Sequence, residues 1–248
     1  MRIEKPNDPA ALRCLWKQAF GDDDSFLDSF FSLGFSPERC RCVLTDGALA
    51  AAAYWFDLSF HGNKLAYIYG VATHESRRGR GICHTLMENI HAHLRQNGYQ
   101  GALLVPGSQA LFCLYAGMGY RVFCGMENTK VAAKQPAAQL KKLDKMQFCA
   151  LRQMRLPRGG IDLSGAMLDM ADAMYDFYEA QDALLCVAKN ARALTIAEFL
   201  GKREQLAHIV AALGTQASVR LSADTPFAMF LPLQENAKAP AWFSLALD

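Results

Sequence analysis

An arginine- and glycine-rich stretch is the part of the chain best suited to chemistry: residues 69–87, YGVATHESRRGRGICHTLM. An apolar, strand-like run leads through this turn into a run with helical spacing. Gly79 and Gly81 leave the first backbone N–H groups of the helix uncovered, and these groups, together with the helix dipole, attract anions. Arg77, Arg78 and Arg80 add positive charge at the same place. The turn is therefore predicted to hold a phosphate group, and a pyrophosphate would fit.

Two common nucleotide-binding loops do not fit this turn. The pattern GxxxxGK[ST] is absent, which argues against a nucleotide-hydrolysing P-loop. The dinucleotide pattern GxGxxG fails because His84 stands where a third glycine is required. The anion site belongs to a different class.

The segment Arg78-Gly79-Arg80-Gly81-Ile82-Cys83 resembles the Q/R-x-x-G-x-G/A motif of the GNAT superfamily of acyl-CoA-dependent N-acetyltransferases. About thirty residues later, LYAGMGY at 114–120 resembles the family's FYxKxGF signature. The resemblance covers residues 1–126, about half of the chain. Cys83 replaces Gly or Ala, but a thiol is only slightly larger than a methyl group. Glu75 stands near the turn, where it could either repel phosphates or pair with a neighbouring arginine.

The resemblance implies that acetyl-CoA is the cosubstrate and an amine the acceptor. The CoA pyrophosphate would lie on the amides from Arg78 to Cys83, and the pantetheine arm alongside Val71–Thr73, whose backbone would polarise the thioester carbonyl. Tyr115 occupies the position of the family's general acid, which protonates the leaving thiolate; packing alone is the alternative role. The cofactor-binding residues implied are Val71, Ala72, Thr73, Arg78, Gly79, Arg80, Gly81, Ile82, Cys83, His84 and Ser108.

Several roles stay open at the level of sequence. Ser108 is either a CoA contact or simply a helix cap. No general base is assigned, because Asp57, His74 and Glu75 are near the site in sequence but are typical surface residues. The function is either acetyl transfer to an amine of a small molecule or peptide, or acyl-CoA binding without catalysis.

The composition excludes several other classes. With 52% apolar residues, 20% charged residues and a net charge of +2, the chain is typical of a soluble globular protein and not of a charge-driven nucleic-acid binder. No apolar run reaches the roughly 18 residues of a membrane span. The N-terminus has no signal-like apolar core, so a cytoplasmic protein without membrane or nucleic-acid partners is expected.

No metal site is predicted. The eight cysteines include no CxxC pair and lie mostly in apolar stretches, which is typical of reduced, buried thiols. Cys40 and Cys42 would share a strand face but lack two further ligands at zinc-site spacing. His84, His91 and His93 are expected on the polar face of their helix, because no two of them are placed for joint ligation.

The elements that must position the turn follow from periodicity. The first half is predicted to be a mixed, mostly antiparallel α/β fold flanked by helices, with the GNAT-like order ααβββαβαβ after a short first strand at 1–4. A three-strand meander turns at Asp46-Gly47 and His61-Gly62-Asn63. The predicted segments are helices around 12–20 and 26–31, strands 39–45, 48–60 and 64–73, a helix from 82 to 97, a strand at 101–106, a helix at 108–117 and a strand at 120–124.

The second half is predicted to be a smaller α/β domain. Residues 129–145 lose aromatic side chains and are predicted to link domains 1–128 and 146–248. This second domain is either a degenerate acetyltransferase-like half that walls the acceptor cleft or a stabilising extension remote from it. Its predicted segments are a strand at 146–154, a helix bearing Met167, Met170, Ala171, Met174 and Tyr178, a strand at 183–188, a helix opened by the capping box 195–198 and running through Gly201-Lys202, and strands at 218–221, 227–231 and 242–247.

The chain end is predicted to be an apolar strand, Ala241–Asp248. An ordered terminus would fix two carboxylates, the Asp248 side chain and the main-chain terminus. In some multi-domain acetyltransferases that this chain resembles, the terminal carboxylate takes the proton from the acceptor. The alternative is an edge strand whose charged tail stays in water.

Overall fold

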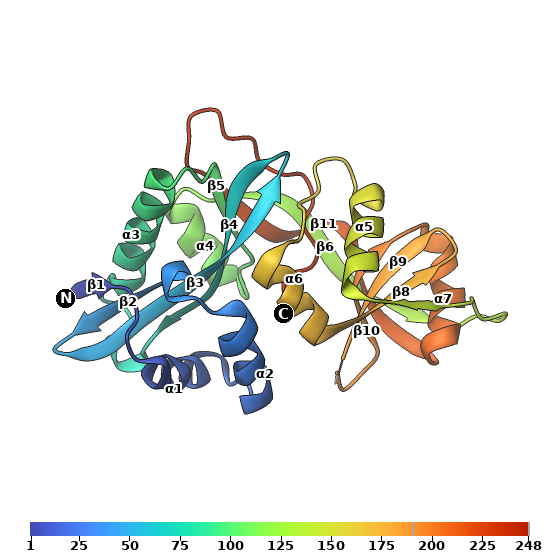
Figure 1. Cartoon of the computed structure of the whole chain (residues 1–248), viewed down its shortest axis with the longest axis horizontal. Helices are drawn as coiled ribbons and strands as arrows, with labels where there is room; N and C mark the ends of the chain where they lie inside the picture. The colour runs from blue at the N-terminus through green and yellow to red at the C-terminus, as the bar shows by residue number, and fades with distance from the viewer. Residues whose placement is uncertain (190, 248) are drawn as a thin grey trace. The chain divides into compact units, whose positions relative to one another are not determined.

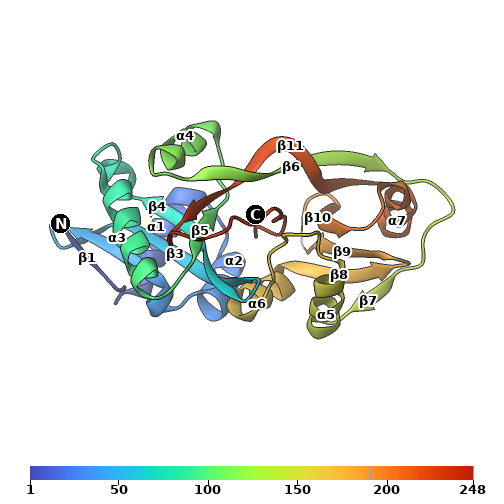
Figure 2. The same ribbon diagram turned by 90° about the horizontal axis from the view of Figure 1, so that it is seen from above.

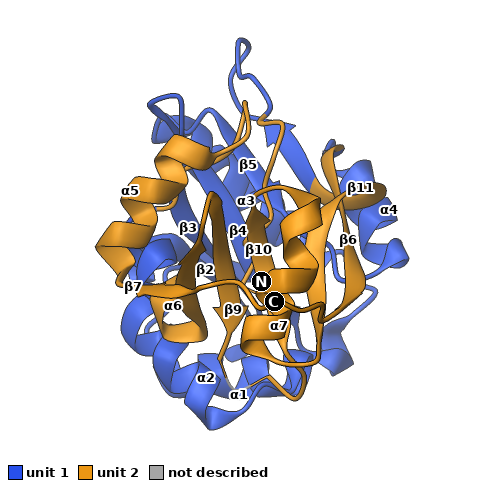
Figure 3. Cartoon of the chain, turned by 90° about the vertical axis from the view of Figure 1, so that its right-hand side faces the viewer, with its two compact units in different colours: residues 1–121, 164–170, 229–239 blue, residues 122–163, 171–228, 240–248 orange. Residues whose placement is uncertain are grey.

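The computed structural model describes residues 1–189 and 191–247 and falls into two compact units, coloured separately in Figure 3. Unit 1 comprises Met1–Arg121, Ser164–Met170 and Met229–Ala239. Unit 2 comprises Val122–Leu163, Ala171–Ala228 and Pro240–Asp248. Each unit therefore draws on three chain segments, whereas the predicted domains 1–128 and 146–248 are continuous. Those domain boundaries stay a prediction.

Unit 1 is built on a mixed sheet (Figure 1). Strands β1 to β4 pair antiparallel in chain order, β5 joins β4 in parallel, and the end of β11 pairs antiparallel with β5. The predicted meander, with left-handed residues at both turns, is confirmed. The elements are β1 (Arg2–Glu4), α1 (Pro9–Phe20), α2 (Asp24–Ser29), β2 (Cys40–Thr45), β3 (Ala48–Phe60), β4 (Asn63–Thr73), α3 (Ile82–Gln96), β5 (Gly101–Leu104) and α4 (Gln109–Gly117).

Alternation along β3 and β4 gives the unit 1 sheet two apolar faces. On one face Trp16 of α1 packs against Phe30 and Tyr54, with ring centroids 4.5 and 5.2 Å away. On the other face Trp55 belongs to a buried cluster to which α3 and α4 contribute. The helices are thus held by burial on both sides of the strands that carry the predicted site.

Unit 2 repeats the element order of unit 1. After β6 (Arg121–Ala132), a strand, two helices, a three-strand meander, a helix and a strand follow one another, as they do in residues 1–104. β7, β8, β9 and β10 pair antiparallel in turn, and β11 joins β10 in parallel. The elements of this repeat are β7 (Lys141–Leu143), α5 (Lys145–Arg155), α6 (Gly165–Met174), β8 (Tyr175–Ala180), β9 (Ala183–Ala188), β10 (Thr195–Leu200), α7 (Leu206–Leu213) and β11 (Gln216–Pro232). The start of α6 and the end of β11 belong to unit 1.

Two predictions for the second half are wrong. Residues 146–154 lie in helix α5 rather than a strand, because Asp144 and Gln147 form a capping box that starts the helix. Residues 195–200 form strand β10 rather than a helix, and Gly201 follows that strand. Five of the six β10 residues are buried, so tertiary burial decides against the local capping pattern.

Other boundaries move as well. The predicted strand at 120–124 runs on to Ala132 beside β11, so the start of the predicted linker is a strand (Figure 2). Tyr178 lies in β8 instead of the preceding helix, and the predicted strands 218–221 and 227–231 are parts of β11. The predicted strand at 242–247 is wrong, because within that range only Trp242 forms a β-bridge, with Gly160. Asp248 lies outside the described residues.

Candidate functional site

Strands β4 and β5 begin as a parallel pair, Leu65–Tyr67 against Gly101–Leu103. β5 ends at Leu104, whereas β4 continues to Thr73. The segment Val71–Thr73 therefore extends past the parallel register, with its backbone available on that side for a ligand.

A bulge shapes β4 just before this segment. The register with β3 shifts around Ala53, and Gly70 has a left-handed φ of 59°. A side chain at Gly70 would meet the Trp16 ring at 2.5 Å, so only glycine lets α1 approach the strand this closely. The sequence analysis did not identify Gly70 and Trp16 as site-shaping residues, although a glycine inside a strand signals a bulge or a close approach.

The turn after β4 has the predicted glycine geometry. Gly79 and Gly81 have φ values of 73° and 75°, and a Cβ at either residue would meet no atom within 4 Å. Gly81 caps α3 with no side-chain hydrogen bond to the first helical amides. Because those amides lack intrahelical acceptors, they face the open space above the glycines. An oxyanion fits this cradle.

Neighbouring side chains hold the turn in place. Arg78 donates from Nε to the carbonyl of Thr73 at 3.1 Å, which ties the turn to the end of β4. Arg77 pairs with Asp46 of the β2–β3 turn at 3.2 Å, so the charge expected from Arg77 at the anion site is partly balanced. Glu75 forms no ion pair among the described residues. Arg80 is exposed beside the glycines.

Tyr115 lies next to the start of α3. It is 6% exposed and belongs to the same buried cluster as Ile82, against which Val71 and Cys83 also pack. Burial, with a smaller contribution from Cys83, raises the pKa of the Tyr115 hydroxyl well above its ordinary value. The phenol is therefore protonated at neutral pH and can act as a proton donor.

The Tyr115 hydroxyl is also accessible. Within the described residues it has no hydrogen-bond partner, yet it is not among the polar atoms that are both fully buried and unpartnered. Its oxygen therefore keeps some contact with solvent. The Tyr115 ring packs edge to face against the Tyr120 ring, with the two ring centroids 5.8 Å apart.

The remaining predicted residues lie around this group. The Ser108 hydroxyl caps α4 by accepting from the Leu111 amide at 3.4 Å, so its capping role is confirmed and its contact with CoA stays a prediction. His84 is exposed and lies 3.4 Å from Glu88. Ala72 is buried, and Thr73 ends the strand.

Two other predictions about side chains are corrected. His91 is buried, not on the polar face, and its Nε2 lies 2.8 Å from the Tyr120 hydroxyl. Burial lowers the His91 pKa from 6.5 to about 4. All eight cysteines are free, but Cys14 and Cys113 are exposed rather than buried. Cys14 lies on α1 and Cys113 on α4, and neither is among the buried residues of its helix.

Two of the three base candidates, Asp57 and His74, are already committed to structural contacts. Asp57 accepts from Tyr99 and lies 3.7 Å from Lys64. His74 accepts the Ser76 amide at 3.3 Å through Nδ1, and its Nε2 lies 3.4 Å from the Gln18 amide nitrogen. These contacts give the two side chains local structural roles and favour neither as the base.

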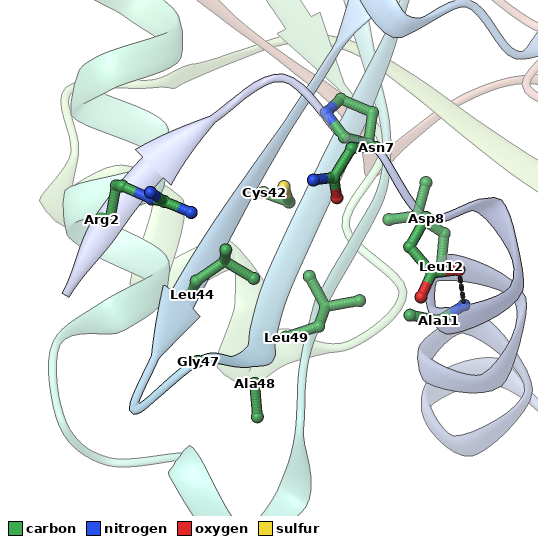
Figure 4. A pocket seen from close by; sticks show the side chains of 11 residues that line it. Arg2, Asn7, Asp8, Ala11, Leu12, Cys42, Leu44, Gly47, Ala48 and Leu49 are labelled. Atoms are coloured by element: carbon green, nitrogen blue, oxygen red, sulfur yellow. Dashed lines mark hydrogen bonds between the residues drawn. The ribbon is translucent and has the colours of Figure 1, made fainter.

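A separate pocket of about 420 Å³ lies between β1, the start of α1 and the β2–β3 turn (Figure 4). Its lining includes Arg2, Asn7, Asp8 and Cys42, and no residue from 78 to 83. Asp8 is engaged as the cap of α1 through the Ala11 amide. The pocket is therefore distinct from the glycine turn.

Two searches of the described residues bear on ligands and membranes. Within residues 1–189 and 191–247, no group of three or more His, Cys, Asp or Glu side chains could hold a metal ion. No helix in those ranges is long and apolar enough to span a bilayer.

The fold and the turn together define a class: a mixed α/β protein with a glycine-lined anion cradle between a bulged strand and a helix. Residues 4–123 match the acetyltransferase (GNAT) domain family, so this region, just under half of the chain, is a GNAT acetyltransferase domain. The sequence has no significant match among curated proteins.

Solved structures share the fold at low identity. A GCN5-related N-acetyltransferase from Anabaena variabilis gives a TM-score of 0.75 at 13% identity, covering 94% of this chain and 73% of that one. One from Kribbella flavida gives 0.67 at 15%, covering 92% and 70%. One from Sphaerobacter thermophilus gives 0.57 at 13%, covering 94% and 96%. At such low identities these TM-scores show a shared fold and no more, and the predicted fold class is confirmed.

Proposed function

We propose that the protein transfers an acetyl group from acetyl-CoA to an amine of a small molecule or peptide. The observation that carries this proposal is the uncapped start of α3 at Gly81, beside the extended end of β4 and within the cluster that holds Tyr115. An anion cradle, a free strand edge and a protonated phenol are the three groups that acyl transfer from a phosphate-bearing thioester requires.

Different residues of the proposed site bind the pyrophosphate, polarise the thioester carbonyl and donate a proton. The amides from Arg78 to Cys83 bind the pyrophosphate, helped by the exposed Arg80. Backbone N–H groups of Val71–Thr73 face the thioester carbonyl, where oxygen becomes negative when the amine attacks; comparable donors contribute about 2.7–4 kcal/mol. Acetyl-CoA supplies an activated acyl carbon and a thiolate leaving group. Tyr115 donates its proton to that thiolate.

The acceptor must also lose a proton. An alkylammonium has a pKa of about 10.4, so a base or a water path is needed at neutral pH. No described residue near the turn is assigned this role, since Asp57 and His74 have structural partners. The terminal carboxylate of Asp248 lies outside the described residues, and its role as the base stays a prediction. Deletion of Asp248 should then abolish turnover while CoA binding persists.

A direct assay separates an enzyme from a binding module. Purified protein is mixed with acetyl-CoA and a panel of amines that includes polyamines, aminoglycosides, amino acids and peptides, and free CoA release is followed with a thiol reagent. We expect steady release that depends on one class of amine, with a matching acetylated product by mass spectrometry. Tight CoA binding without release for any amine would favour the alternative, an acyl-CoA-binding module without catalysis.

Unit 2 bears on this function through its element order. The repeat of the unit 1 order supports the proposal that the second half is a degenerate acetyltransferase-like half. Its turn after β10, Gly201-Lys202-Arg203, lacks the paired glycines of the unit 1 turn. We therefore place the single CoA site of the described chain in unit 1, and the role of unit 2 in shaping the acceptor cleft stays a prediction.

A further inference from the structure

A pocket of about 300 Å³ opens in unit 2 where β10 and β11 diverge. The two strands pair in parallel only at Thr195–Ile196 and Ser218–Val219 and then separate. The residues that line the pocket all belong to unit 2. Its place corresponds, by element order, to the divergence of β4 and β5 in unit 1.

The chain's own C-terminal segment fills most of this divergence. Ser244 donates from its hydroxyl to Glu198 of β10 at 2.7 Å, and its carbonyl accepts from Arg220 of β11 at 2.9 Å. Residues 243–247 are buried. A long ligand such as CoA is thereby excluded, and the space that remains suits a small molecule.

The described lining of this pocket is basic. Arg155, Arg203 and Arg220 contribute to it, and among residues 1–189 and 191–247 no aspartate or glutamate does. Arg203 is exposed, and one of its five N–H donors is used on the Ser222 carbonyl at 2.8 Å. Arg220 is only 9% exposed, so its charged group is presented from a fixed position.

Arg155 is the partly balanced member of the three. It pairs with Glu179 at 2.7 Å and donates to the Ala183 carbonyl. Glu179 does not line the pocket. Among the described residues, the positive charge offered to a ligand at this pocket therefore rests on Arg203.

Aromatic side chains form the rest of the wall. Phe199 and Trp242 both line the pocket. Trp242 is held by a hydrogen bond from Nε1 to the Ser222 hydroxyl at 3.3 Å, and Arg152 lies over its ring at 5.7 Å. A planar apolar body fits against such a wall while its charged end meets the arginines.

We propose that this pocket binds a small organic oxyanion, a carboxylate or phosphate group carried on a planar apolar body. Guanidinium groups match both oxyanions because their N–H donors can bond two oxygens at once. The proposal is independent of acetyl transfer in unit 1, because every residue it uses belongs to unit 2.

The test is a titration with simple probes in the Gly81→Asp variant, so that the unit 1 turn does not compete for phosphate. Phenyl phosphate, benzoate, inorganic phosphate and neutral benzyl alcohol are compared by calorimetry and by tryptophan fluorescence. We expect saturable binding of phenyl phosphate or benzoate, weaker binding of inorganic phosphate and none of benzyl alcohol. Trp242→Phe should remove the fluorescence change while calorimetric binding remains.

Matched variants locate the site. Arg203→Ala should weaken phenyl phosphate or benzoate binding by roughly 10-fold or more, the effect of losing one charge-assisted hydrogen bond. Arg158→Ala removes a nearby exposed cation that does not line the pocket and should leave affinity unchanged. No saturable binding up to about 10 mM, a range that already covers weak ligands, would overturn the proposal. So would equal affinities in the two variants, or benzyl alcohol binding as tightly as the anions.

Discussion

The two units use the same order of elements but treat the gap between their diverging parallel strands differently. In unit 1 the strand ends in a turn with two left-handed glycines and an uncapped helix start. In unit 2 the strand β10 carries Glu198, whose carboxylate is 1% exposed and bound by Arg152 and Ser244. The first gap is suited to a long incoming ligand, and the second is largely filled by the chain itself, which leaves a pocket of about 300 Å³.

The difference shows how little of a fold is needed to change its use. Unit 2 lacks the two glycines of the unit 1 turn, and a segment near the end of the chain lies between its diverging strands. Its helices and strands nevertheless follow the same order. A buried bidentate ion pair then stabilises the closed gap, with Arg152 donating to Glu198 at 2.8 and 3.0 Å. The fold by itself therefore does not identify the reactive unit, and the side chains at the gap do.

The largest expected effect comes from a substitution at the proposed acetyl-transfer site of unit 1. Tyr115→Phe should lower kcat by about 10²–10⁴-fold, because the general acid is removed while the buried ring is kept. CoA affinity, measured by calorimetry, should change little. Tyr178→Phe, in β8 of unit 2, serves as the control that removes a phenol elsewhere. Unchanged turnover in Tyr115→Phe would reduce Tyr115 to a packing role.

The glycine turn itself is tested by binding. Gly81→Asp puts a side chain and a negative charge where a phosphate would lie, and CoA affinity should fall by about 10³-fold as several charge-assisted hydrogen bonds are lost. Gly62→Asp is the matched control, since Gly62 has the same φ of 75° and equally open surroundings. Equal CoA affinity in the two variants, with both folded, would move the site elsewhere.

The closed gap is tested by stability. Glu198→Ala leaves the buried Arg152 unpaired, and loss of one partner of such a pair costs about 3–5 kcal/mol in the free energy of unfolding. Glu179→Ala breaks the half-exposed pair with Arg155 and should cost about 1 kcal/mol or less. Urea denaturation followed by Trp242 fluorescence measures both variants in a background where Trp16 and Trp55 are phenylalanine. Similar costs would show that the Glu198 pair does not stabilise the closed gap.

The smallest expected effect is a pH dependence confined to unit 1. His91 has a folded pKa of about 4 against 6.5 when unfolded, so the unfolded state binds more protons between these values. The contribution of His91 to stability is therefore lost as pH falls from 6.5 to 4, by about 3 kcal/mol in total. His91→Gln should flatten this dependence in urea denaturation curves. A wild-type curve already flat over this range would contradict it.

Much of unit 1 could be predicted from the sequence because its signals are local. The turns at Asp46-Gly47 and around Gly62 set the meander, and Gly79 with Gly81 set the turn where we propose that phosphate binds. These residues need left-handed backbone angles, which only a few residue types adopt readily. The cap of α4 at Ser108 is equally local.

Other features depend on contacts between distant residues. The sequence of β10 contains a good helix-start pattern, yet burial between β9 and β11 makes it a strand. His91 is polar by type, and only its place behind Tyr120 buries it. Local propensity is weak compared with burial, so such residues follow the tertiary structure.

The sequence by itself determined the glycine turn, the meander before it and the match of residues 4–123 to an acetyltransferase family. Only the tertiary structure decided that residue 70 must be glycine, because a side chain there would meet the Trp16 ring. It also decided that Tyr115 is buried beside Cys83 and that Ser244 contacts both β10 and β11. The physical reason is the distance along the chain between the residues that interact. Backbone angles are chosen by neighbouring residues, whereas burial and charge pairing are chosen by residues that meet only after the chain has folded.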